Sequence, residues 1–196
     1  MYFNITSNTF KIWTYTVLFA IALYESVRYL LRLYLHGKLR FSMFILFACV
    51  LYPHYYTWWM IFNYLNDDYY YQWYHQMFFS ITELVSTAMV LYLCDKSRPA
   101  TPSHLLLVIA TAVLHILASG GDQFVRNVIM GRGQMYQIYR DIGFMLPDVI
   151  NIMIPAYLWV TWCRSNNTPL TQSITRAELG LACISVAMLW ALCSAL

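Results

Sequence analysis

The sequence predicts an all-α membrane protein built as a bundle of six transmembrane helices. Composition supports this first, because 60% of the 196 residues are hydrophobic and only 11% are charged. A soluble domain typically has about 45–50% apolar and about 25% charged residues. Apolar runs also recur along the whole chain, and each is long enough for a helix to cross about 30 Å of hydrocarbon. Together these observations indicate an integral membrane protein.

Six apolar runs follow one another, and short loops connect them, so we expect one transmembrane domain over residues 1–196. The predicted helices cover 12–35, 41–64, 70–93, 104–127, 136–162 and 175–196. The runs are continuous, whereas the strands of a membrane barrel show alternating segments of about ten residues. The first run carries Glu25 and Arg28 and lacks a small-residue cleavage pattern, so we interpret it as a mature helix rather than a signal peptide.

Prolines and glycines predict irregularities in three of these helices. Pro53 lies in the second run, and the sequence Ser-Gly-Gly-Asp at 119–122 interrupts the fourth. Pro147 and Pro155 lie on either side of Asp148 in the fifth. Because a proline removes a backbone hydrogen bond and bends a helix, we expect these bends to open a cavity. The paired glycines are equally well explained by close packing between helices.

Basic residues predict the orientation of the bundle, because Lys and Arg concentrate in the cytosolic loops of membrane proteins. Three alternate loops carry the positive charges Arg32, Lys38, Arg40, Lys96, Arg98, Arg164 and Arg176. The sequence therefore predicts that these loops are cytosolic and that both termini are luminal or extracellular. A glycosylation sequon, Asn4-Ile5-Thr6, lies on the predicted outer side and agrees with this orientation.

Other features argue against several classes of function. The five cysteines form no Cys-x-x-Cys pair, so neither a disulfide framework nor a thiolate zinc site is indicated. The net charge is only +3, and the basic residues are spread over short loops rather than gathered in one tract, so we expect no nucleic-acid partner. No two of the central His and acidic residues lie three or four positions apart on one helix, so we expect neither a metal nor another cofactor.

One ionisable side chain lies near the middle of each of the first five apolar runs. These residues are Glu25, His54, Glu83, His115 and Asp148. A charged group at membrane depth costs about 2.5–3.5 kcal/mol on insertion scales. At 1.5 Å of rise per residue, all five lie within about two turns of the bilayer centre. The sequence therefore predicts that they share an interior site.

Several of these residues also have a purely structural interpretation. Glu25 precedes Arg28 by three positions and pairs most simply with it on the same helix. His54 follows Pro53 and is equally well explained as a partner for carbonyls that the proline frees. Glu83 has no basic residue on its own helix, which makes it the strongest functional candidate.

Further polar and aromatic side chains flank the central layer. We expect ligand-binding roles for His115, Asn151, Trp58, Asp122, Arg126 and Glu25. Arg126 follows Asp122 by one turn and supplies a compensating charge. Aromatic residues near helix ends, Trp58 among them, fit either an interfacial belt or the lining of a pocket.

Residues 41–162 resemble the four-helix core of the EXPERA family, which includes the emopamil-binding sterol isomerase and the sigma-2 receptor. The similar features are His54 in Tyr-Pro-His, Glu83 in Thr-Glu-Leu, and Asp148 ahead of a proline. Where the isomerase pattern has a second acid one turn after its His, this chain has Trp58. The resemblance implies an endoplasmic-reticulum bundle whose lipid-accessible pocket takes a sterol or an amphiphilic amine, with Glu83 and Asp148 paired to a cationic group.

The sequence leaves three functions open. The first is binding of a hydrophobic or amphiphilic ligand, such as a sterol or a cationic amine, with acid/base isomerisation as its chemistry. In it, Glu83 is the proton donor or counter-ion, His54 is its partner and Asp148 orients the substrate. The second is transport of protons or another cation by the same layer. The third is a role as an accessory subunit of a larger membrane complex. All three leave a homo-oligomer open, and we expect the protein in the endoplasmic reticulum or the plasma membrane.

Overall fold

The computed structural model describes residues 6–67 and 73–196, apart from the side chains of residues 121 and 122. Within these ranges the chain forms helices and no strand, which confirms the all-α fold class. The elements are α1 (Ser7–Leu35), α2 (Phe41–Asn66), α3 (Trp73–Leu93), α4 (Pro102–Ser119), the π-helix η1 (Gly120–Ile129), α5 (Met135–Ser165), the 3-10 turn η2 (Leu170–Gln172) and α6 (Arg176–Ala195).

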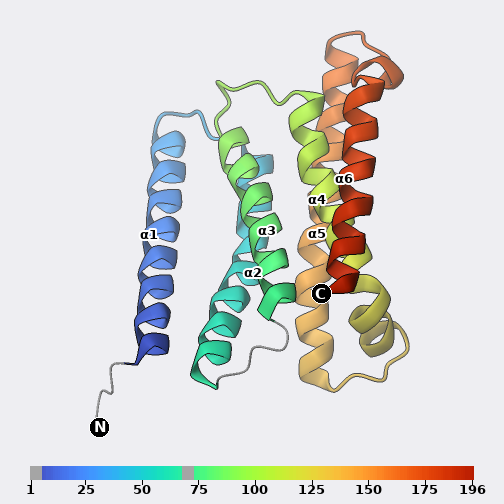
Figure 1. The fold of residues 1–196 in the computed structure, drawn as a ribbon. Coiled ribbons are helices and arrows are strands. Elements are labelled where there is room, and N and C mark those ends of the chain that lie inside the picture. Colours follow the sequence, from blue (N-terminus) through green and yellow to red (C-terminus); the bar gives the residue numbers. More distant parts are fainter. Residues whose placement is uncertain (1–5, 68–72) are drawn as a thin grey trace.

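The long helices run alternately up and down, roughly side by side (Figure 1). α1 lies at one edge and packs on α2, whereas α4, α5 and α6 form the opposite side of the bundle. This up-and-down order brings the α1–α2, α3–α4 and α5–α6 connections to the same end of the molecule. Those connections and the adjoining helix ends hold the seven basic residues of the predicted cytosolic face.

In the described part of the chain, four helices are long and apolar enough to cross a membrane, namely α3, α4, α5 and α6. They fit an integral membrane protein, but they do not establish the six spans that the sequence predicts. α1 is less apolar because it carries Lys11, Glu25, Arg28 and Arg32. α2 contains several Tyr and Trp residues, whose polar atoms make it less apolar than a run of Leu and Ile.

The largest apolar core lies toward the end that holds the basic loops. Its fully buried members include Met43 and Leu46 on α2, Val90 on α3, and Leu105 and Val108 on α4. Between membrane helices such contacts stabilise mainly through dispersion, since lipid is as apolar as the core itself. Two backbone hydrogen bonds then join the α1–α2 loop to the α3–α4 loop, at 2.7 and 2.8 Å. These contacts hold the helices together at this end of the bundle.

The predicted irregularities take a milder form than expected. α2 continues through Pro53, and α5 continues through Pro147 and Pro155. At Gly120 the fourth helix does not stop but changes from α to π geometry and continues to Ile129. π-Helical segments are rare and often lie at functional sites.

Gly143 allows α2 and α5 to approach each other closely. A Cβ atom at this position would lie 2.5 Å from Cε1 of Tyr52, and that ring also packs on Phe144, with ring centroids 5.6 Å apart. Any larger side chain at residue 143 therefore forces the Tyr52 ring or the two helices apart.

Gly143→Ala is expected to lower the free energy of unfolding by about 1–3 kcal/mol, the usual cost of overpacking. Gly180→Ala is the matched control, because nothing lies within 4 Å of a Cβ at that helical position. That change should be neutral or stabilising by up to about 1 kcal/mol, since Ala favours helices more than Gly. Thermal unfolding in detergent measures both, and equal melting temperatures for the two variants would contradict the Tyr52 contact.

Candidate functional site

Three of the five central ionisable residues lie at matching depth on neighbouring helices. Glu83 is residue 11 of the 21 in α3, and Asp148 is residue 14 of the 31 in α5. His115 is residue 14 of the continuous segment formed by α4, with 18 residues, and η1, with 10. Because α3 packs on α4 and α4 packs on α5, similar depth brings the three side chains together.

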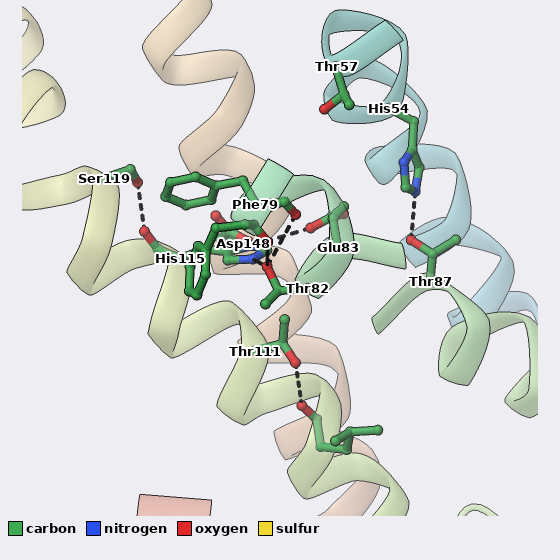
Figure 2. Close-up of polar contacts among 12 residues, drawn as sticks. His54, Thr57, Phe79, Thr82, Glu83, Thr87, Thr111, His115, Ser119 and Asp148 are labelled. Carbon is green, nitrogen blue, oxygen red and sulfur yellow. Dashed lines mark hydrogen bonds and ion pairs between the residues drawn. The ribbon is translucent and has the colours of Figure 1, made fainter. Parts of the chain in front are cut away.

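Glu83, His115 and Asp148 form a buried group that we call the central cluster (Figure 2). His115 Nδ1 lies 3.2 Å from Glu83 Oε2 and 3.3 Å from Asp148 Oδ1. The residues are only 8%, 4% and 7% exposed, respectively. One imidazole nitrogen thus faces two carboxylates from two different helices in a site that solvent hardly reaches.

Thr82 fixes a proton on the Nε2 atom of His115. Its Oγ1 lies 2.7 Å from His115 Nε2, and also 3.0 and 3.1 Å from the carbonyl oxygens of Phe78 and Phe79. Carbonyl oxygens only accept hydrogen bonds, so the single hydroxyl proton of Thr82 is directed to them. Oγ1 then accepts a hydrogen bond from the Nε2–H group. Nδ1 is left to face the two carboxylates.

The central cluster therefore contains more acceptors than donors. Glu83 Oε1 is buried and has no hydrogen-bond partner among the described residues. The same holds for Asn151 Oδ1, which lies one helical turn beyond Asp148. Buried acceptors without donors are rare in native structures, because each one loses its hydration without compensation. An additional proton or a metal ion between the carboxylates and Nδ1 would satisfy this excess.

The fourth helix changes geometry directly beside the central cluster. Ser119 donates its hydroxyl to the carbonyl oxygen of His115 at 2.7 Å, at the residue where α4 passes into η1 (Figure 2). The backbone that carries His115 is thus held by a side chain at the transition from α to π geometry.

His54 borders the central cluster but does not contact it. Its Nε2 lies 2.8 Å from Oγ1 of Thr87, which is one turn beyond Glu83 on α3 (Figure 2). The partner that the sequence predicted for Glu83 is therefore a neighbour, and the direct contact belongs to His115.

Of four other predicted ligand-binding residues, three lie away from the central cluster, and the side chain of the fourth lies outside the described part of the structure. Trp58 donates its indole N–H to a threonine hydroxyl of α1 at 3.0 Å. Glu25 pairs with Arg28 at 2.9 Å, and both side chains are about half exposed, as expected for an intrahelical ion pair. Arg126 is exposed on η1. The side chain of Asp122 lies outside the described part of the structure.

A second polar group joins η1 to the start of α5. Buried Asp141 accepts hydrogen bonds from Asn127 at 2.7 Å and from Arg140 at 2.8 Å. Arg140 also donates to Gln123 at 2.7 Å. Sequence reasoning found no role for Asn127, whose only signal was its position on the same segment as Asp122 and Arg126.

Comparison with known proteins gives a family but no characterised relative. No curated protein and no solved structure matches the chain. The likeness to the EXPERA family therefore stays a prediction. The model of a family of unknown function, DUF8801, matches residues 1–196, so the chain belongs to that family.

Proposed function

We propose that this protein binds a cation at the centre of the membrane and carries it across, as a transporter of protons or of another small cation. The observation that supports the proposal most is the excess of buried acceptors in the central cluster. Ionisable residues inside membrane proteins are costly and mark ion paths and proton relays in many transporters. Three such residues meet here from three helices. This arrangement is better explained by a role in cation transport than by separate structural ion pairs.

The contact distances favour a small occupant. With Nδ1 only 3.2 and 3.3 Å from the two carboxylate oxygens, the space between these atoms suits a proton or a single ion. A ligand of sterol size would need α3, α4 and α5 to separate. A cavity of about 510 Å³ does exist among Lys11, Tyr15, Leu65, Trp73 and Tyr74, and none of the residues predicted for the site lines it.

Buried polar residues extend from the central cluster along two helices, and they offer a path for the cation. They lie three, four or seven positions from Glu83 on α3 or from Asp148 on α5, which places them on the same face as the central cluster. These residues are Ser80, Ser86 and Thr87 on α3, and Asp141 and Asn151 on α5. The stretch from residue 141 to residue 151 covers about 15 Å of helix, roughly half the hydrocarbon thickness.

In this proposal α1 and α2 complete a bundle of six membrane spans. They have 29 and 26 residues, enough to span about 30 Å, and they run alongside the four apolar helices. The basic loops face the cytosol and both termini lie on the other side, in accordance with the positive-inside rule.

Asp148→Asn tests the function directly in liposomes that contain the purified protein and a pH-sensitive dye. Wild-type protein should collapse an imposed proton gradient, and the variant should do so at least about tenfold more slowly. A tenfold change corresponds to only about 1.4 kcal/mol of barrier, less than loss of a buried charge usually costs. Asn has nearly the same shape as Asp, so the fold should persist.

Glu25→Gln is the matched control, because it makes the same acid-to-amide change at an exposed ion pair on α1. Its rate should stay within about twofold of wild type, because exposed pairs contribute about 0–1 kcal/mol. Rates for Asp148→Asn equal to wild type would refute the role of the central cluster in transport. A wild-type rate no faster than that of empty liposomes, under gradients of protons and of monovalent and divalent cations alike, would refute transport itself.

A further inference from the structure

We propose that the central cluster is a binding site for a divalent transition-metal ion, and that zinc suits its donor atoms best. The ligands would be Glu83 Oε2, His115 Nδ1 and Asp148 Oδ1. This inference rests on the proposed function and names the cation that the site takes. It also revises the expectation of no metal, which considered ligand pairs on a single helix, whereas these three donors come from three helices.

The distances between the donor atoms fit a metal site. Zinc binds His nitrogen and carboxylate oxygen at about 2.0–2.2 Å, and a tetrahedron with such bonds has edges of about 3.3–3.6 Å. The two edges that meet at Nδ1 measure 3.2 and 3.3 Å. All three donor atoms lie within 4.8 Å of one another, so a modest approach of the two carboxylates closes the third edge.

The surroundings of His115 also match those of a metal ligand. A metal-binding His typically donates its second ring N–H to a neighbouring acceptor, which orients the ring and leaves the other nitrogen free for the metal. Thr82 Oγ1 provides that acceptor for Nε2 at 2.7 Å. The ring is further held by Phe79, whose centroid lies 5.3 Å away.

Charge balance favours a divalent ion over a single proton. With both carboxylates ionised, a proton on Nδ1 leaves the buried cluster with a net charge of −1. A divalent ion and a neutral imidazole instead bring the net charge to zero, because two negative charges meet two positive ones. Since burial makes an uncompensated charge costly, the divalent ion is the better match.

The donor set also limits which metal fits. One imidazole nitrogen and two carboxylates suit zinc, manganese or ferrous iron, whereas calcium takes six to eight oxygen ligands. Three protein ligands leave a fourth position open, as in zinc sites that exchange a ligand. Glu83 Oε1 and Asn151 Oδ1, both buried and without a partner among the described residues, are available to that position or to a water molecule bound there.

The test is metal binding by the full-length protein in detergent, after a chelator has removed any bound ion. Isothermal titration with zinc should show one site per chain. Titration with cobalt should give the visible absorption of a tetrahedral site, without the charge-transfer band of a thiolate ligand. A thiolate band would assign the metal to a cysteine and would overturn the inference.

Three variants sharpen this result. Glu83→Gln should weaken zinc binding at least about 100-fold, because loss of an outer partner alone costs about 10–100-fold. Thr82→Val should weaken zinc binding by about 10–100-fold, and it provides a second test if Glu83→Gln fails to fold. Glu25→Gln should bind as wild type does. Equal affinities for the Glu83 and Glu25 variants would overturn the site.

The outcomes also separate this inference from the proposed function. Protein that moves protons in liposomes but binds no zinc, manganese or ferrous iron would disprove the metal site and leave transport standing. Protein that binds zinc at Glu83 but moves neither zinc nor protons would disprove transport and leave the metal site standing.

Discussion

His115→Ala is expected to lower the free energy of unfolding by about 3–5 kcal/mol and to abolish cation binding. In the native protein, Nδ1 of this residue lies within 3.3 Å of both Glu83 and Asp148. Removing one partner of a buried ionic group leaves the other charges uncompensated, which costs about that amount. The variant would retain two buried carboxylates and no basic partner between them.

His54→Ala is the matched control for this experiment. His54 contacts Thr87 through one hydrogen bond of 2.8 Å, and loss of a typical hydrogen bond costs about 0.5–1.5 kcal/mol. Cation binding should survive in this variant. A loss of binding equal to that of His115→Ala would favour the assignment from sequence, in which His54 is the partner of Glu83.

The combined change of His115→Ala, Glu83→Gln and Asp148→Asn separates stability from function. Replacing a whole buried ionic group by neutral residues is often neutral or stabilising. The triple variant should therefore recover most of the stability that His115→Ala loses, yet bind no cation. Thermal unfolding in detergent and zinc titration provide the two readouts. A triple variant as unstable as His115→Ala would contradict the electrostatic explanation.

Arg40→Met should lower the free energy of unfolding by about 2–3 kcal/mol. The guanidinium group of Arg40 donates to the carbonyl oxygens of Leu93, at the end of α3, and of Arg98 in the loop that follows, the latter at 2.8 Å. Hydrogen bonds that involve a charged group contribute about 1.5–3 kcal/mol each. We expect less than the sum of two such bonds, because Arg40 is only partly buried.

Two further variants test this contact at the same loop. Lys38→Met removes an exposed positive charge two residues away and should change stability by less than about 0.5 kcal/mol. Arg40→Lys keeps the charge but lacks the planar fork that reaches two carbonyls, so its stability should be intermediate. Equal melting temperatures for Arg40→Met and Lys38→Met would show that Arg40 serves only as a topology signal.

The positions of the helices could be predicted closely from sequence because each depends on local properties. A run of about 20 apolar residues in lipid must satisfy its backbone hydrogen bonds internally, and a helix does so within the segment itself. Within the described residues, the six helical segments accordingly begin and end within about five residues of the predicted bounds, whereas the predicted start of the third run at residue 70 lies outside them. The change to π geometry at Gly120 escaped prediction, because glycines signal a weak point in a helix but not the hydrogen-bond pattern that replaces it.

The depth of the ionisable residues was likewise a property of sequence, since a constant rise per residue converts position into height. Which of them meet was decided only by packing. His54 and His115 have similar depths, but α4 brings His115 between Glu83 and Asp148, whereas α2 directs His54 to Thr87. The rotation of each helix about its own axis depends on contacts between distant segments. For that reason the acceptor-rich centre of this protein became visible only in the tertiary structure.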